Sequence, residues 1–422
     1  MKITDYLNEP FTASLKERFI SYAKIYTESN SEQADKGIQP STPGQWDLAK
    51  LLNSQLKELG LENVQTTDFC YTYGFFKASA GQENNPPYCL LAHIDTVEEV
   101  TGKDVNPIVH ENYDGKAITL PYGNVLDPAK DKALALAGEE KDTIISSTGH
   151  TLLGGDDKAG VAAIMTMLEY FVQHPEVKHG PIEVIFSPDE ETGHGMDHVP
   201  VDLIKSKYAY TVDGGHLGEL EKECFNAYKA DVTFTGKSKH TGDARPDMVN
   251  AINIASAFVA NLPRHQMPET TDGYQGFYCP MKIEGGIEEA KVSLILRDFT
   301  MEGMKERLAN VELLANTQAQ LFGGKAQVTS EQQYLNMKEG MDKAPQVVEN
   351  LVKAYEQASV PVKFVPIRGG TDGSRLTEMG IPTPNIFTGG HNYHSRNEWV
   401  SLSQMAAATQ VLIELGKINT TN

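Results

Sequence analysis

Short apolar strands that alternate with helical segments are the feature that most constrains the fold of this 422-residue chain. Residues 88–92, 182–187 and 209–212 are mainly apolar runs of the kind that form buried strands. Apolar residues recur at helical spacing in residues 43–60 and from about residue 158 to 173. Strands separated by helices predict an α/β fold with a mostly parallel, doubly wound sheet that is covered on both faces.

The pattern changes after about residue 221, which indicates a second domain. Two helical segments follow, at residues 249–262 and 301–321. Three strand patterns accompany them, at residues 230–235, 292–299 and 327–333. Helix and strand patterns of the first kind resume at residues 347–358, 363–366 and 386–388. We therefore expect an inserted α+β domain at 222–336 between the two parts of a main domain at 1–221 and 337–422. Residues 101–141 are interpreted as a long, turn-rich stretch.

Charge and cysteine content exclude several classes of protein. The formal net charge is −20 and the pI is about 5.0, so the surface repels phosphate backbones and anionic lipid. We therefore expect no nucleic-acid partner and no membrane partner, although simple solubility also accounts for most of this charge. No run approaches the roughly 18 apolar residues of a membrane span, and the first residues do not resemble a signal peptide. The chain has four cysteines, at positions Cys70, Cys89, Cys224 and Cys279. They lack the short paired spacing of a zinc-thiolate site. Reduced cysteines of this kind favour a cytoplasmic protein.

A histidine and an aspartate follow the first buried strand. His93 and Asp95 are two residues apart, so they point to the same side of an extended chain. A metal-binding histidine commonly donates its second ring N–H to a carboxylate, and His-x-Asp supplies both groups. The alternative is an ordinary hydrogen bond within a loop.

Acidic residues gather at two further turns. Asp156 and Asp157 follow two glycines at the start of an apolar helix, where the helix dipole favours a carboxylate. A helix N-cap by either aspartate is the alternative, and the spacing is not that of a phosphate loop. Glu190 and Glu191 follow the strand 182–187, where adjacent buried acids repel each other unless a cation lies nearby. A solvated acidic loop is the alternative at this second turn.

Asp213 and His394 complete a set of five residues, each predicted to follow a strand of the parallel sheet. Open α/β sheets form their binding crevices at that edge. Three carboxylates and two imidazoles without a thiolate suit zinc, cobalt or manganese. Two such metals about 3.5–4 Å apart require a shared carboxylate, so five ligands for two metals imply that one is shared.

These motifs, with others along nearly the whole chain, resemble the peptidase T family of tripeptide aminopeptidases, within the superfamily of dizinc exopeptidases and aminoacylases. The resemblance is carried by Ala-His-Ile-Asp-Thr at 92–96, Leu-Leu-Gly-Gly-Asp-Asp-Lys-Ala-Gly at 152–160, Ser-Pro-Asp-Glu-Glu at 187–191 and Tyr-Thr-Val-Asp-Gly-Gly at 210–215. It extends through Gly-Tyr-Gln-Gly-Phe-Tyr at 273–278, Ile-Arg-Gly-Gly-Thr-Asp-Gly at 367–373, Asn-Ile-Phe-Thr-Gly-Gly at 385–390 and Asn-Tyr-His at 392–394.

The resemblance implies a role for each site residue. It assigns His93 and Asp213 to one zinc, Glu191 and His394 to the other, and makes Asp156 the bridging ligand. Asp95 would be the partner of the His93 ring. Glu190 would be the general base, which agrees with the idea that one of two adjacent acids binds metal while its neighbour accepts a proton.

The inserted domain would be a lid over the catalytic main domain. Within it, His240 would contact the reacting carbonyl and Arg297 would bind a substrate carboxylate. A surface histidine and a salt bridge within the lid are the respective alternatives. His391 departs from the family pattern, which has tyrosine there, and residues 395–397 also depart from it; these differences concern substrate preference rather than the reaction.

The expected function is removal of the N-terminal residue from short peptides, chiefly tripeptides, with two Zn²⁺ per subunit and Co²⁺ or Mn²⁺ as substitutes. The partners would be short peptide substrates, and the chain would be a monomer or a homodimer. A dipeptidase or an N-acyl-amino-acid deacylase on the same scaffold is the alternative, followed by a binding protein without enzymatic activity.

Overall fold

The computed structural model describes residues 2–419, which divide into two compact units. The first unit comprises the chain up to Lys222, Gly340–Val365 and the chain from Thr371 onward. The second unit comprises Glu223–Glu339 and Pro366–Gly370. The predicted inserted domain thus falls almost wholly in the second unit, which also takes up the short segment 366–370 that the sequence pattern placed in the main domain.

An eight-stranded sheet forms the centre of the first unit. Its strands, in spatial order, are β1 (Glu62–Thr66), β2 (Thr72–Phe76), β8 (Ile182–Ser187), β3 (Tyr88–His93), β9 (Ala209–Gly214), β16 (Asn385–Phe387), β10 (Glu219–Cys224) and β15 (Lys363–Ile367). The central strands β8, β3, β9 and β16 pair in parallel. Antiparallel pairs, β2 with β8 and β10 with β16, flank this centre. The predicted α/β class is therefore confirmed, with a parallel centre and antiparallel strands toward the edges.

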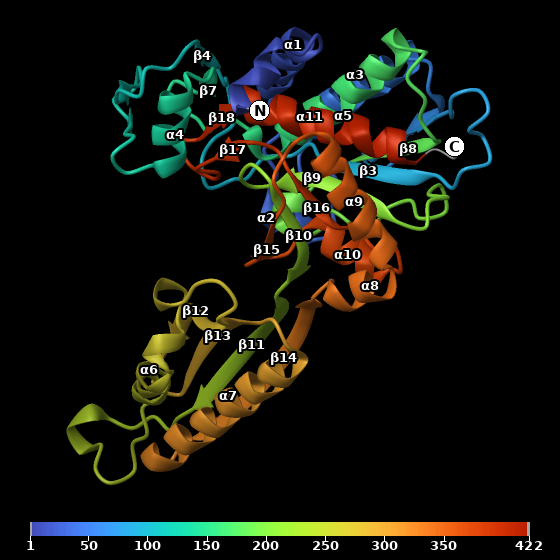
Figure 1. The fold of residues 1–422 in the computed structure, drawn as a ribbon. Coiled ribbons are helices and arrows are strands. Elements are labelled where there is room, and N and C mark those ends of the chain that lie inside the picture. Colours follow the sequence, from blue (N-terminus) through green and yellow to red (C-terminus); the bar gives the residue numbers. More distant parts are fainter. Residues whose placement is uncertain (1, 420–422) are drawn as a thin grey trace. The chain divides into compact units, whose positions relative to one another are not determined.

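Both faces of the sheet are buried at its centre, where every residue of β3 and β8 is buried, which explains the mainly apolar sequence of these strands. In β3, Leu90 and Ala92 belong to the large hydrophobic core, whereas Cys89 and Leu91 pack in a second core on the other face. Figure 1 shows α5 and α11 along one face of the sheet. The helices that contribute to the large core are α1 (Thr12–Ala23), α3 (Gln45–Glu58), α5 (Gly155–Gln173), α9 (Pro345–Gln357) and α11 (Leu402–Ile418). The second core includes Leu376 of α10 (Asp372–Glu378).

The stretch 101–141 is rich in turns up to residue 131, as expected, but it also contains regular elements. It contains α4 (Lys132–Glu140) and three short strands, β4 (Ile108–His110), β5 (Ile118–Thr119) and β6 (Val125–Leu126). Asp131 caps α4 by accepting a hydrogen bond from the Leu134 backbone N–H at 3.0 Å. Leu134 and Ala137 are buried in a small core with Trp399. A second, four-stranded sheet runs beside this core in the order β17 (Gly390–His391), β18 (Trp399–Ser401), β7 (Ile144–Ser146) and β4.

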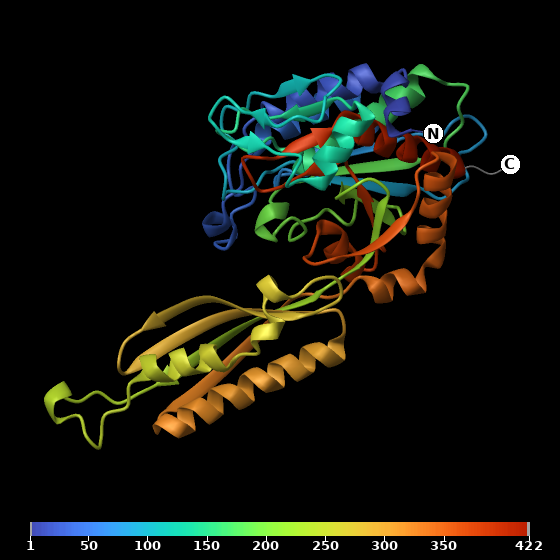
Figure 2. The same ribbon diagram turned by 60° about the vertical axis from the view of Figure 1, so that its left-hand side comes forward.

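The second unit is an antiparallel sheet with two helices on one face, as Figure 2 shows. The strand order is β12 (Phe277–Gly285), β13 (Glu289–Asp298), β11 (Asn226–Thr235) and β14 (Lys325–Tyr334), and the helices are α6 (Ala251–Asn261) and α7 (Met301–Phe322). Alternate residues of β13, such as Val292 and Leu294, face a core of their own with α6 and α7. Of the two remaining short helices, α2 (Ser31–Ala34) belongs to the first unit and α8 (Lys338–Lys343) includes the boundary between Glu339 and Gly340. Among residues 2–419, none of the helices has both the length and the apolar character that crossing a membrane requires.

Candidate metal centre

The five residues predicted as metal ligands lie together in the first unit. His93 is the last residue of β3, Asp213 lies near the end of β9, and Glu191 belongs to a 3-10 turn, Glu190–Thr192, that follows β8. His394 lies in the loop between β17 and β18. Asp156 is the exception to the expected placement, because it stands at the start of α5 and the strand before it, β7, ends at Ser146 in the smaller sheet.

The two oxygens of Asp156 face different partners. Oδ1 lies 2.8 Å from His93 Nε2, and that nitrogen lies 3.6 Å from Asp213 Oδ1. Oδ2 lies 3.4 Å from His394 Nε2, and that nitrogen lies 3.0 Å from Glu191 Oε2. One carboxylate therefore stands between two histidine–acid pairs, which is the arrangement that a bridging ligand needs.

Burial and close spacing strengthen the electrostatic repulsion among the acids of this cluster. Burial raises the pKa of Glu191 to about 8, with the charge of Asp156 adding to the effect. Burial also raises the pKa of Asp213 to about 6. Burial opposes ionisation of Asp156 as well, but hydrogen bonds from His394 and His93 hold its pKa below the usual range. Bound cations would relieve this repulsion, as they stabilise ionised carboxylates.

The donor set fits divalent metal ions. His93, Asp156 and Glu191 each offer one ligand atom, and these atoms lie within 4.8 Å of one another. The donors are imidazole nitrogens and carboxylate oxygens, the ligands that suit zinc, cobalt and manganese. Asp157 lies within the same range of His93 and Asp213. Its oxygens, however, accept hydrogen bonds from the Gly160 and His93 backbone N–H groups at 3.1 and 3.3 Å.

The helix-cap alternative raised for this turn therefore applies to Asp157. Asp156 and Asp157 have non-helical backbone angles, and the hydrogen bond from Gly160 N–H to Asp157 Oδ1 has the spacing of an N-cap. With Asp157 fully buried and committed to the backbone, the Asp156 carboxylate remains free to face the histidines.

Asp95 connects the histidine strand to the acidic turn. Its Oδ1 lies 3.3 Å from His93 Nδ1. The same oxygen accepts the Glu190 backbone N–H at 3.0 Å, and Oδ2 accepts the Glu191 backbone N–H at 3.2 Å. This fully buried carboxylate thus contacts both the ring of one candidate ligand and the backbone of another.

The Glu190 carboxylate has a different environment. Burial raises its pKa well above the usual range; His93 opposes this shift, whereas Asp213 and Asp372 add to it. Among residues 2–419, its oxygens accept none of the hydrogen bonds observed, while its backbone is held by Asp95. A carboxylate without a hydrogen-bonding partner beside a cluster of candidate ligands has the chemistry of a proton acceptor.

Three buried carboxylates around the cluster were not singled out by the sequence analysis. Asp189 accepts hydrogen bonds from Ser41 N–H at 2.8 Å and from the Gln45 side chain at 2.6 Å. Asp372 accepts the Ser187 hydroxyl hydrogen bond at 2.5 Å, and burial raises its pKa to about 7. Glu398 accepts backbone N–H groups of the turn that leads to Asp156. The only local signal for Glu398 is an acid placed directly before the apolar strand β18.

His391 does not face the cluster. Its Nδ1 lies 2.9 Å from His216 Nδ1, and its ring stacks on Trp399 with the ring centroids 4.1 Å apart. Burial lowers the pKa of His391 to about 3, with His216 adding to the effect. A neutral imidazole between a second histidine and a tryptophan supports the loop that carries His394.

The two predicted substrate residues belong to the second unit. His240 is exposed, and its Nδ1 accepts the Gly242 backbone N–H at 3.1 Å. Arg297 in β13 donates to Gln333 Oε1 at 3.1 Å and lies over the ring of Tyr334. Their roles toward a substrate stay predictions.

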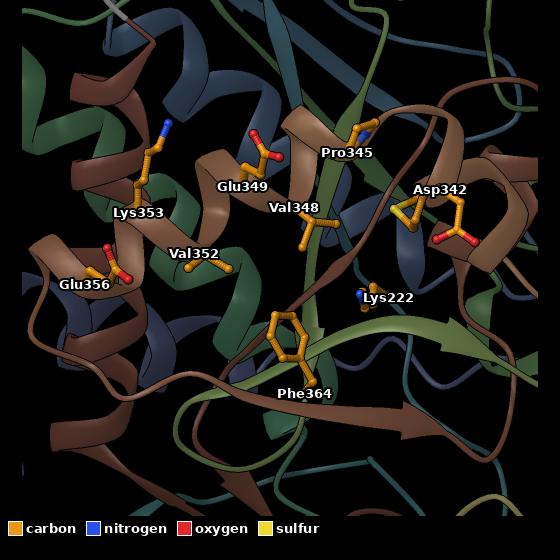
Figure 3. Close-up of a pocket in the computed structure, with 10 residues that line it drawn as sticks. Lys222, Asp342, Pro345, Val348, Glu349, Val352, Lys353, Glu356 and Phe364 are labelled. Atoms are coloured by element: carbon orange, nitrogen blue, oxygen red, sulfur yellow. The ribbon is translucent and has the colours of Figure 1, made fainter.

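A hollow of about 510 Å³ lies elsewhere on the first unit, along α9. Figure 3 shows Val348 and Val352 of α9 facing Phe364 of β15 across it. Its lining includes none of the candidate metal ligands, so the hollow is separate from the metal centre.

Comparison with known proteins gives matches over most of the chain. A sequence model described as "Peptidase family M20/M25/M40" matches residues 135–417. Peptidase T of Clostridium perfringens is 44% identical over 403 residues, which cover 95% of this chain and 98% of that protein. Peptidase T of Listeria innocua is 43% identical over 407 residues, covering 96% and 98%.

Solved structures establish the same fold at lower sequence identity. An aminopeptidase PepT from Bacillus cereus and a tripeptidase from Staphylococcus aureus each superpose with a TM-score of 0.76 at 22% identity, covering 97% of this chain and 98% of the other. A dinuclear metal-binding peptidase of the M20 family from Bacillus subtilis gives a TM-score of 0.65 at 14% identity, with the same coverage.

Proposed function

The chain belongs to peptidase family M20/M25/M40, and from this we infer that it is a metal-dependent aminopeptidase that releases the N-terminal residue of short peptides, chiefly tripeptides. The substrate class is supported by the near-complete coverage of relatives named Peptidase T. The observation that carries the reaction is the position of Asp156, with one oxygen toward His93 and the other toward His394.

We propose two Zn²⁺ ions per subunit, for which Co²⁺ or Mn²⁺ would substitute. His93 and Asp213 would hold one ion, Glu191 and His394 the other, and Asp156 would bind both. When bound, the two ions would polarise the scissile carbonyl and lower the pKa of a water molecule. The separation of the Asp156 oxygens between the two histidines supports this division.

Proton transfer is assigned to Glu190. Its carboxylate accepts a proton from the attacking water and returns it to the nitrogen of the leaving amine. Within the part of the chain that the structure describes, none of the hydrogen bonds observed involves the carboxylate oxygens of Glu190, so they remain available to accept the proton. Asp95 holds the Glu190 backbone and contacts the His93 ring, so it orients the base and a ligand together.

Glu190→Gln tests this assignment. The amide keeps the shape of the side chain but cannot accept the proton, so kcat on Ala-Ala-Ala should fall by about 100- to 10,000-fold. Zinc content, measured on the same preparation, should stay at the wild-type value because Glu190 is not a ligand. Glu176→Gln, at an exposed glutamate, is the control and should leave kcat unchanged. Turnover near wild type in the Glu190 variant would rule out Glu190 as the base.

A panel of Ala-Ala-Ala, Ala-Ala and N-acetyl-alanine, each with and without a chelator, tests the substrate class. Chelator-sensitive hydrolysis of the tripeptide above the other two is the expected result. Activity confined to Ala-Ala would indicate a dipeptidase, and activity confined to N-acetyl-alanine a deacylase. No hydrolysis with zinc, cobalt or manganese supplied would indicate a binding protein instead.

Substrate contacts are proposed for His240 and Arg297, which would reach the reacting carbonyl and a substrate carboxylate. We also propose that the enzyme works in the cytoplasm. The thiols of Cys70, Cys89 and Cys279 support this, because thiols persist in a reducing compartment.

A further inference from the structure

One buried carboxylate accepts hydrogen bonds from four consecutive backbone N–H groups at the turn before α5. Glu398 is 1% exposed. Its Oε2 accepts from Leu153 at 2.6 Å and Gly154 at 2.9 Å. Its Oε1 accepts from Gly155 at 2.7 Å and Asp156 at 3.3 Å. The last donor belongs to the residue whose side chain stands between the two histidines of the candidate metal centre.

We propose that Glu398 is a positioning residue for the metal centre, which sets the place of Asp156 relative to His394. Glu398 is four residues beyond His394 in the chain and binds the turn that ends in Asp156. Asp156 Oδ2 lies 3.4 Å from His394 Nε2. The two ligands are connected through the short chain segment 394–398 and the hydrogen bonds that Glu398 accepts from the turn, so these set their separation. Displacement of the turn from Glu398 would move the proposed bridging ligand away from its second metal.

The chemistry of this contact requires a carboxylate. An ionised carboxylate offers about four acceptor positions and no donor, which matches four converging N–H groups. A glutamine in its place would offer one oxygen and direct an NH₂ group at N–H donors. At least one buried donor would then lose its partner, and the turn would shift to satisfy it.

The glycines of the turn make this approach geometrically feasible. A methyl group on Gly155 would lie 2.8 Å from Val400 Cγ1 and 3.0 Å from Glu398 Oε1, closer than such atoms normally pack. Gly154 has a positive φ of 82°, which glycine adopts at little cost. The turn is thus shaped to bring its N–H groups onto one side chain.

Asp142 provides a matched control, because it is a buried carboxylate of the same unit with a similar set of donors. It accepts hydrogen bonds from Thr143 N–H at 2.7 Å, from Ser403 Oγ at 2.7 Å and N–H at 3.3 Å, and from the Ser401 hydroxyl. These contacts join β7 to the start of α11 and do not include a segment that carries a candidate ligand. Asp142→Asn should therefore lower stability without altering the metal centre.

The experiment compares Glu398→Gln with Asp142→Asn in the full-length protein. Zinc dissociation constants are measured by competition with a chromophoric chelator, and the visible spectrum is recorded for the cobalt-loaded protein. Loss of a group that orients a ligand typically weakens metal binding by about 10- to 100-fold. We expect that loss for one of the two zinc ions in Glu398→Gln, with an altered cobalt spectrum. At saturating zinc we expect a lower kcat on Ala-Ala-Ala and a KM within about threefold of wild type, since the reacting centre rather than general binding is disturbed.

Two outcomes would overturn the proposal: unchanged zinc affinity and cobalt spectrum in Glu398→Gln, or equal weakening of zinc binding in Asp142→Asn. Should Glu398→Gln fail to fold, Gly155→Ala tests the same contact and should weaken zinc binding in the same direction. The inference rests on the proposed metal-dependent function, but the zinc and cobalt measurements do not depend on the substrate. Intact metal binding with no tripeptide hydrolysis in the wild type would therefore overturn the proposed substrate alone.

Discussion

Glu221 lies in the large sheet where β10 pairs with β16, and it carries a carboxyl group with an unusual proton affinity. Burial is the main cause that raises its pKa to about 8, while a hydrogen bond from the Asn385 amide at 3.0 Å opposes the rise. Glu221 is not one of the candidate ligands, but the charges of Glu219 and Asp213 add to the rise, so its effect on folding has to be measured at one fixed metal load. Because the folded state holds the proton more tightly than the unfolded chain, this group's contribution to stability is complete below about pH 4.5 and is lost as pH rises through 8.

Replacement of Glu221 by glutamine should remove this pH dependence. The amide still accepts the Asn385 hydrogen bond but cannot ionise. One pKa unit corresponds to about 1.4 kcal/mol, so the wild type should lose at least about 1 kcal/mol relative to the variant between pH 5 and pH 8. Urea unfolding of both proteins at pH 5, 6.5 and 8, with the same metal load, measures the difference. A constant difference across these pH values would contradict the assignment.

Residues differ in how far the sequence reveals their place in the site. His93 and Asp213 lie at the ends of strands and Glu191 follows one; the apolar runs of these strands are visible in the sequence, and the sheet brings the three residues to one edge. Glu398 could not be found this way, because its role depends on backbone donors that lie 242 to 245 residues earlier in the chain. The choice between Asp156 and Asp157 also depends on backbone geometry, since only the structure shows which of them accepts the Gly160 N–H.

At the scale of elements, buried strands and long amphipathic helices could be predicted, whereas short or exposed elements could not. The strand predicted at 182–187 matches β8, and the helix predicted from about 158 to 173 matches the regular part of α5. Strand β12 was not predicted, because its last five residues are exposed and Pro280 interrupts its pattern of alternating side chains. Helix α4 was missed because its nine residues bury few side chains and owe their start to the Asp131 cap.

Close packing of α5 on the sheet depends on Gly160. A methyl group at this position would overlap the backbone carbonyl oxygen of Val212 in β9 and the carboxylate of Asp157. Alanine is the better helix former by about 1 kcal/mol, but forced separation of packed elements costs about 1–3 kcal/mol or more. Gly160→Ala should therefore lower the free energy of unfolding, measured by urea titration in the presence of a chelator.

Gly286→Ala is the control for this prediction, because no atom lies within 4 Å of the added methyl group. It should change the free energy of unfolding by no more than about 0.5 kcal/mol. Equal stability of Gly160→Ala and the wild type would show that α5 can move away from β9 without cost.

At the scale of the whole molecule, each of the two units has its own hydrophobic core, but the candidate ligands all belong to the first unit. The second unit has its own core of residues from β11, β12, β13, α6 and α7. Every candidate ligand, the proposed base and Asp95 belong to the first unit. The sequence pattern changes near residue 221, next to the boundary at Lys222, but it gives no sign that Pro366–Gly370 belongs to the second unit. Arg368 joins that unit through hydrogen bonds to the backbone oxygens of Gly273 and Gln275.

Metal removal should therefore loosen one unit and leave the other unchanged. Without cations, Asp156, Asp213 and Glu191 repel one another in a buried site, as the raised pKa values of the last two indicate. A ligand present at 1,000 times its dissociation constant stabilises the folded state by about 4 kcal/mol, and a chelator removes that contribution.

Hydrogen–deuterium exchange, measured with zinc and with a chelator, should be faster with the chelator at residues 93–96, 153–158, 187–193 and 389–394. Strands β11 and β13 should exchange at the same rate in both conditions, since their core contains none of the candidate ligands. Faster exchange in those strands as well would mean that the metal centre stabilises both units together, and no change in the first unit would mean that these residues do not hold a metal.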